Sequence, residues 1–275
     1  MQNSAIVQTE VTLDSVQQAR RGLVIYFAIL ILATAILETM IIRSGAMGLL
    51  VLLLMFMPTL ASVIARLSLR EGFGDVSFRV GGRRGVQGML LGLLQPLLVG
   101  LIAYGIAWSV GLAEFAPPAF GLLFLAELSV QFVVQTIGGL GEEIGWRGYM
   151  LTRLIDAGVP YPVLVSGLIW GAWHLPLLFS GLYFAGPNVY LSALLFMVAV
   201  TVLAWFYAQL RLVTGSIWPT VILHGAGNAI LHNVFDASTR GDQALLWIGE
   251  SGILVTLAVI AVSVLLMRFW RPRAA

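Results

Sequence analysis

The sequence predicts an all-α fold, a polytopic bundle of about eight transmembrane helices with both termini in the cytoplasm. Hydrophobic residues make up 59% of the chain and charged residues only 10%, whereas soluble globular domains are usually about 45–50% apolar. The apolar residues form long blocks, and about 20 such residues in a helix cross a hydrocarbon core of about 30 Å. Arginines fall at the ends of these blocks, which is typical of membrane proteins.

The predicted spans follow one another along the chain. Residues 1–21 are polar and are predicted to form a short cytoplasmic tail, because a cleaved signal peptide has its charge and apolar region earlier. Residues 22–270 are predicted to form a single transmembrane domain without internal repeats. The spans cover residues 22–42, 47–67, 86–111, 118–140, 160–180, 188–209, 213–233 and 244–267.

The basic residues support this count and its orientation. All 15 are arginines. With a cytoplasmic N-terminus, every arginine except Arg43 and Arg240 lies on the cytoplasmic side, as the positive-inside rule requires. The arginines form no stripe on one face, which argues against nucleic-acid binding. We therefore expect an integral multi-pass protein of the lipid bilayer, in the plasma membrane if the source is bacterial.

Charged residues at membrane depth are costly and are therefore candidates for function. The stretch GEEIGWRGYML, residues 141–151, carries Glu142, Glu143 and Arg147. Adjacent helical residues point about 100° apart, so the two carboxylates face different directions. Arg147 lies four residues after Glu143 and can pair with it, and it also lies within reach of Glu142. One glutamate is then free to act; alternatively, the stretch is a solvated helix end.

The chain has only three histidines, and all lie in or at the end of apolar segments. His174 follows two tryptophans and precedes a proline; it is either functional or simply bonded to a backbone carbonyl. His224 and Asn228 are four residues apart and share a helix face, as a site or as a polar clamp between helices. His232, at the outer helix end, is predicted to be structural. Glu127 either lines the same cavity or joins helices.

Together these polar groups suit hydrolysis. A carboxylate and a histidine can hold a water molecule and take its proton, while a second histidine and an asparagine can stabilise the oxyanion. A nucleophilic enzyme is not favoured, because cysteine is absent and no serine lies in an elbow motif. Zinc would require ligands such as Glu142, His174 and His224, but HExxH is absent, so we expect no metal or other cofactor.

Two alternatives come from other classes of protein. Glutamate and histidine inside the membrane also serve as relay groups in ion- or proton-coupled transporters, although no repeat of the kind found in transporters is evident. A catalytically silent immunity or partner-binding protein is the other alternative. The loop at residues 66–84 suggests no chemistry.

Three ordered motifs resemble those of a known family. EEIGWR (142–147), WGAWH (170–174) and HGAGN (224–228) are similar to the EExxxR, FxxxH and HxxxN or HxxxD motifs of the CPBP family. These are intramembrane proteases related to the CAAX prenyl endopeptidase and are also called Abi proteins. The resemblance covers about residues 120–235, and Trp170 stands where the family has phenylalanine.

The resemblance implies an intramembrane endopeptidase that cleaves a membrane-associated peptide or protein. The sequences of its motifs resemble those of the bacterial branch. The family is often labelled as metalloproteases, but the resemblance implies the metal-independent glutamate type. The matched residues would act as catalytic Glu142 and His174, supporting Glu143 and Arg147, and oxyanion-binding His224 and Asn228. We expect these side chains to converge on one cavity that opens to the cytoplasmic side.

Overall fold

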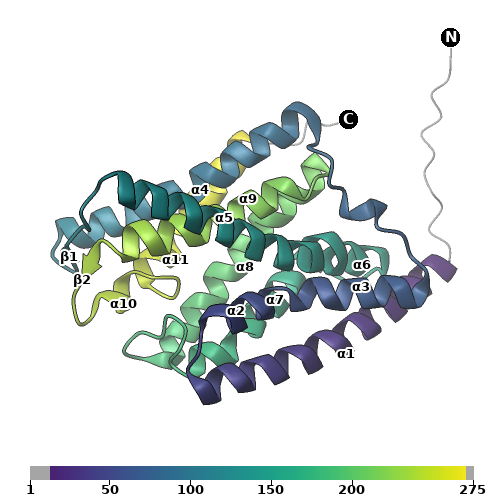
Figure 1. Ribbon diagram of the computed structural model, residues 1–275. Helices are drawn as coiled ribbons and strands as arrows, with labels where there is room; N and C mark the ends of the chain where they lie inside the picture. The colour runs from purple at the N-terminus through teal and green to yellow at the C-terminus, as the bar shows by residue number, and fades with distance from the viewer. Residues whose placement is uncertain (1–12, 271–275) are drawn as a thin grey trace, which may run out of the picture.

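A computed structural model describes residues 13–270 as a bundle of helices (Figure 1). Three short helical turns interrupt or precede the longer helices, at Gly74–Val76, Trp146–Met150 and Leu231–Asp236; the last two are π-helical. The helices are α1 (Leu13–Ser44), α2 (Gly48–Met55), α3 (Met57–Leu69), α4 (Gly82–Ser109), α5 (Leu122–Gly145), α6 (Leu151–Asp156), α7 (Pro162–Phe179), α8 (Val189–Thr214), α9 (Trp218–Ile230), α10 (Ala244–Trp247) and α11 (Ile253–Phe269). One antiparallel pair of two-residue strands, β1 (Glu114–Phe115) and β2 (Thr239–Arg240), joins two loops.

The protein is an integral multi-pass membrane protein. Within the described chain, six helical segments are long and apolar enough to cross a membrane. The α9 and α11 helices lie in the two other predicted spans but are shorter, so the total of eight spans stays a prediction. The six segments are Leu13–Ser44, Gly48–Leu69, Gly82–Ser109, Leu122–Asp156, Pro162–Phe179 and Val189–Thr214.

Some predicted boundaries differ from the structure. The predicted tail at 1–21 lies outside the described residues as far as residue 12, and helix α1 already begins at Leu13. The predicted last span, 244–267, is wrong in its first part, because α10 is a single turn and the long helix starts only at Ile253. Gly249 adopts a positive φ of 76° between them, a conformation that favours glycine. The predicted span 118–140 begins at Leu122, and its helical segment runs on to Asp156.

Helix α9 lies at the centre of the bundle, between α4 and α5, while α8 packs against α7 and α11 (Figure 1). Glycines allow the close approach: a Cβ on Gly139 of α5 would lie 2.9 Å from the Cβ of His224. A Cβ on Gly92 of α4 would lie 3.0 Å from the Leu223 backbone nitrogen. Small residues at such crossings are typical of membrane helices, and here they bring α5 and α9 together at the polar motifs.

Buried and paired arginines mark one end of the bundle. Arg66 is fully buried and donates to Asp75 at 2.5 Å and to the Gly148 carbonyl at 2.9 Å. Arg153 pairs with Glu71 at 2.8 Å, and Arg211 donates to the Asp75 carbonyl. These contacts hold the loop between α3 and α4 against the bundle, so the loop has a structural role.

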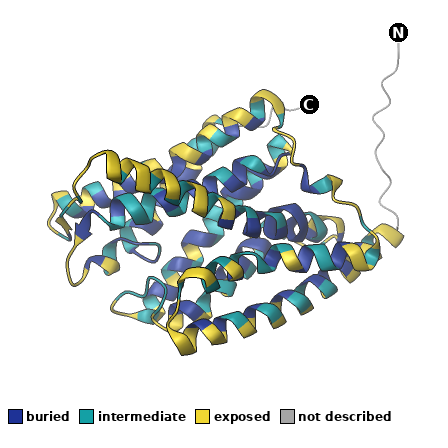
Figure 2. Cartoon of the chain, in the orientation of Figure 1, coloured by how far each residue is buried: buried dark blue, intermediate teal, exposed yellow. Residues whose placement is uncertain are grey.

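Exposed residues follow the outer sides of the helices. Figure 2 shows a long exposed stretch on α5, whereas exposed and buried residues alternate along α1. Many of the exposed side chains are large and apolar, including Leu122, Leu123, Val130 and Leu32. Such a surface is suited to lipid, and the buried polar motifs are therefore set apart from it.

Candidate functional site

The two adjacent glutamates are buried inside the bundle. Glu142 is 2% exposed, Glu143 is 0% exposed and Arg147 is 1% exposed. Helix α5 does not end at these residues, because the π-helical turn Trp146–Met150 carries it into α6. The alternative that this stretch is a solvated helix end is therefore wrong.

Two indole groups hold one oxygen of Glu142. Trp146 Nε1 donates to Glu142 Oε2 at 3.1 Å, and Trp170 Nε1 donates to the same oxygen at 3.0 Å. The other oxygen, Oε1, lies 3.7 Å from His224 Nε2. The carboxylate is thus fixed in orientation, with Oε1 turned toward the groups of α9. The sequence indicated Trp170 only as an aromatic residue in place of the phenylalanine of the family motif, and it did not indicate Trp146.

Glu143 has a different set of partners. Its Oε1 accepts from Arg147 Nη1 at 2.8 Å and lies 3.0 Å from His224 Nδ1. The Arg147 guanidinium also lies over two rings, 4.0 Å from the centroid of Trp170 and 4.2 Å from that of Tyr207. The structure therefore pairs Glu143 with Arg147 and leaves Glu142 without a cationic arginine partner.

His174 contacts the same region from α7. Its Nδ1 lies 2.8 Å from the Trp170 carbonyl, and because a carbonyl can only accept, Nδ1 must carry the proton of that bond. The neutral ring then has a free lone pair on Nε2. Rings of Trp173 and Phe196 enclose the imidazole at centroid distances of 4.8 and 5.2 Å. The backbone bond foreseen as an alternative exists, and it leaves Nε2 available as a base.

Asn228 lies one turn beyond His224 on α9 and contacts α5. Its Nδ2 donates to Gln135 Oε1 at 3.2 Å. An amide nitrogen carries two hydrogens, so one of them remains for another acceptor. Gln135 lies on α5 and is partly buried, whereas Glu127, nearer the start of that helix, is exposed.

A single cavity of about 450 Å³ joins the predicted residues. Glu142, His174, His224 and Asn228 all line it, together with Gln135. The bundle thus brings together the four side chains from three separate helices that the sequence predicted to converge.

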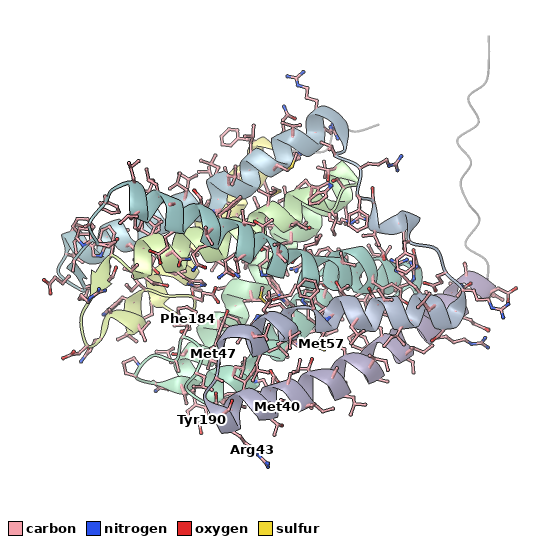
Figure 3. The ribbon with its side chains drawn as sticks, in the orientation of Figure 1. Met40, Arg43, Met47, Met57, Phe184 and Tyr190 are labelled. Atoms are coloured by element: carbon pink, nitrogen blue, oxygen red, sulfur yellow. The ribbon has the colours of Figure 1, made fainter. Side chains whose placement is uncertain are left out.

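The lining of this cavity extends toward one end of the bundle. It extends to Met47 before α2, to Phe184 in the loop after α7 (Figure 3) and to Glu250 before α11. These residues lie at the end of the bundle opposite to the paired arginines Arg66 and Arg153. The loops of that end and the start of α2 form part of its wall, and the expected opening to the cytoplasmic side stays a prediction.

The His232 side chain belongs to a separate network in that wall. Its Nδ1 lies 3.0 Å from Asp236, its Nε2 lies 3.0 Å from Glu250, and Phe184 stacks on the ring at 4.6 Å. Burial raises the pKa of Glu250, but hydrogen bonds from His232 and Tyr183 outweigh it and lower this pKa to about 2. The network ties three segments together, which fits the structural role predicted for His232.

No cluster of three or more histidine, cysteine, aspartate or glutamate side chains within residues 13–270 is arranged to hold a metal ion. The polar atoms explain this, since Glu142 Oε2 and Glu143 Oε1 already accept from nitrogen donors. A guanidinium next to Glu143 would also repel a cation.

Comparison with protein families gives one match. The model of a family described as type II CAAX prenyl endopeptidase, Rce1-like, matches residues 124–230. This segment contains all three motifs and all six predicted site residues, from Glu142 to Asn228. No curated protein sequence matches the chain.

Proposed function

We propose that the chain is an intramembrane endopeptidase of the glutamate type, because residues 124–230 match the Rce1-like family model. It would hydrolyse a peptide bond of a membrane-associated peptide or protein by activating a water molecule. The observation that supports this most is the buried Glu142, fixed by two indoles on the same cavity as His174, His224 and Asn228.

Water activation uses the free atoms of the first two motifs. A water in the cavity hydrogen-bonds to Glu142 Oε1 or His174 Nε2, and one of them takes its proton as the water oxygen bonds to the carbonyl carbon. The carbon–oxygen double bond becomes a single bond with a negative oxygen. The proton then passes to the departing nitrogen as the carbon–nitrogen bond breaks, which leaves a carboxylic acid and an amine.

Stabilisation of the oxyanion is the role of α9. His224 Nδ1 donates to Glu143, so in the doubly protonated ring Nε2 is a second donor. The remaining Asn228 N–H is one turn away. Two such donors aimed at the developing charge are worth about 10²–10³ each in rate when removed singly in other enzymes.

We propose further that catalysis needs no metal ion. Glu143, Arg147 and His224 neutralise one another by direct contacts, and water activation falls to Glu142 and His174. Chelators such as EDTA and phenanthroline should then leave cleavage by the purified protein unchanged, and restoration of a chelated sample by zinc would contradict the proposal.

The shape of the cavity bears on the substrate. Its wall is largely apolar, with Met47, Val51 and Met55 on one side and Val255 and Val259 on another. With the arginine end in the cytoplasm, this cavity lies in the outer half of the protein. We therefore propose that the substrate presents an apolar segment from the outer half of the bilayer.

The test is a search for peptides whose cleavage depends on Glu142. Membranes containing the wild-type protein or the Glu142→Gln variant are compared by mass spectrometry of peptide termini, and a candidate peptide is then cleaved by purified protein. Glu142→Gln and His174→Ala should each abolish cleavage while the protein stays folded. Glu127→Gln is the matched control, because Glu127 is an exposed glutamate of the same helix.

The outcomes separate the alternatives. Full cleavage by Glu142→Gln would overturn the proposal. Coupled ion uptake in proteoliposomes without cleavage would indicate a transporter, and full complementation of a null strain by Glu142→Gln would indicate a catalytically silent partner-binding protein.

A further inference from the structure

A second concave site lies at the arginine end, between α4 and α11, which pack side by side (Figure 1). It is a groove of about 530 Å³ and shares no residue with the cavity of Glu142. Three polar side chains line its beginning: Arg83, Arg84 and Gln87. The rest of its lining is apolar, consisting of Leu90, Leu91, Leu94, Leu266, Phe269 and Trp270.

The polar and apolar parts follow each other along one helix. Residues 83, 87, 90 and 94 recur every three or four positions and therefore share a face of α4. At 1.5 Å per residue, Arg83 and Leu94 are about 16 Å apart along the axis. The groove thus has a cationic start at the membrane surface and an apolar continuation toward the bilayer centre. The N-terminus of α4 at Gly82 adds partial positive charge beside the arginines.

The two arginines of the groove differ from the three arginines that hold the loop between α3 and α4. Arg66 and Arg153 are held by carboxylates, and Arg211 donates to a backbone carbonyl. Among residues 13–270, no carboxylate lies within ion-pair distance of Arg83 or Arg84. Two adjacent positive charges without a protein counter-ion favour an anionic ligand.

We propose that this groove binds one anionic phospholipid of the cytoplasmic leaflet. Its phosphate contacts Arg83 and Arg84, and an acyl chain lies along the leucines of α4 and against Phe269. Leu90 is 59% exposed and Phe269 is 85% exposed, so both are open to lipid. Trp270 also lines the groove, and tryptophan is enriched at membrane–water interfaces. A free phosphate would use only the polar start of the groove, and a neutral lipid only its apolar part.

The experiment uses the purified full-length protein in detergent and counts bound lipids by native mass spectrometry. Phosphatidylglycerol, phosphatidylcholine with the same acyl chains, and inorganic phosphate are added separately. Wild-type protein should retain one phosphatidylglycerol in preference to the other two. Each arginine near an anionic surface contributes about 1 kcal/mol, so Arg83→Gln/Arg84→Gln should weaken phosphatidylglycerol binding about 30-fold.

Matched variants distinguish lipid binding in this groove from a general attraction between exposed arginines and anionic lipid. Arg79→Gln removes an exposed arginine that does not line the groove and should leave binding unchanged. Leu94→Trp fills the apolar part and should reduce binding, whereas Leu93→Trp, on the same helix outside the groove, should not. Equal retention of phosphatidylcholine, full competition by equimolar phosphate, or wild-type binding by the double arginine variant would each overturn the proposal. A melting temperature like that of the wild type confirms that the variants are folded.

Discussion

Removal of Arg147 should destabilise the fold more than almost any other single polar substitution. Arg147 and Glu143 are both essentially excluded from solvent and lie 2.8 Å apart. In Arg147→Met the apolar volume is largely kept, but the Glu143 carboxylate stays buried with only His224 as a partner. Breaking a buried pair by removing one member costs about 3–5 kcal/mol. That is a large part of a total stability of about 5–15 kcal/mol.

Two further variants of this pair separate charge from packing. Arg147→Lys keeps the positive charge but loses the planar group that lies over Trp170 and Tyr207, at a cost of about 1–2 kcal/mol. Glu143→Gln/Arg147→Met removes both charges together, so it should be more stable than Arg147→Met alone. This order arises only if the penalty comes from an uncompensated buried charge.

Unfolding by SDS in mixed micelles, followed by circular dichroism, measures these differences. Arg43→Met, an exposed arginine at the other end of the bundle, is the control and should change stability by less than about 0.5 kcal/mol. A loss below about 1 kcal/mol in Arg147→Met, or a double variant less stable than that single one, would refute the reasoning.

Three further predictions concern single residues. Gly145→Ala should strongly destabilise the protein, because its Cβ would overlap the Pro58 backbone, whereas Gly105→Ala has open space and should not; melting temperatures in detergent compare them. Glu250 has a pKa of about 2 in the fold against an ordinary 4.5, so its contribution, at most about 3 kcal/mol, is complete above pH 4.5 and is lost as the pH falls toward 2. Glu250→Gln should flatten this acid dependence of stability; an unchanged pH profile would count against it. Trp170→Phe removes one donor to Glu142 and should lower kcat about 10-fold or more with little loss of stability, a result that wild-type kcat would contradict.

Composition and periodicity were sufficient for the class of fold. Long apolar blocks with arginines at their ends predicted a multi-pass bundle, and six described helical segments meet that expectation. The glycine-broken start of the last span was missed, since averaged hydrophobicity does not detect a positive φ at Gly249. The passage of α5 into α6 was also missed, because a π-helical turn leaves no pattern in apolar spacing.

The residues of the candidate site were predictable from the sequence, but most of the contacts between them were not. Spacing of four residues along one helix indicated the pairing of Arg147 with Glu143. Contacts between helices depend on their rotation and depth, which one sequence does not contain. For that reason the indole donors Trp146 and Trp170 and the extent of the cavity appeared only in the structure. A tryptophan near a buried glutamate in an apolar chain was the one available signal, since an indole N–H needs an acceptor when buried.

The two glutamates illustrate why so apolar a chain keeps charge at its centre. Glu143 contacts Arg147 and His224, so its charge is neutralised and the histidine ring is held in place. Glu142 instead receives two neutral N–H groups on one oxygen, which orient the carboxylate without supplying a positive charge. An oriented carboxylate with one oxygen free is what a base requires, whereas a carboxylate bound to a guanidinium is a poor one. Removing the charge of one glutamate at a time, by Glu142→Gln or Glu143→Gln, should therefore have unequal effects. The first removes cleavage with little change in stability, and the second reduces stability because it leaves Arg147 buried without its anion.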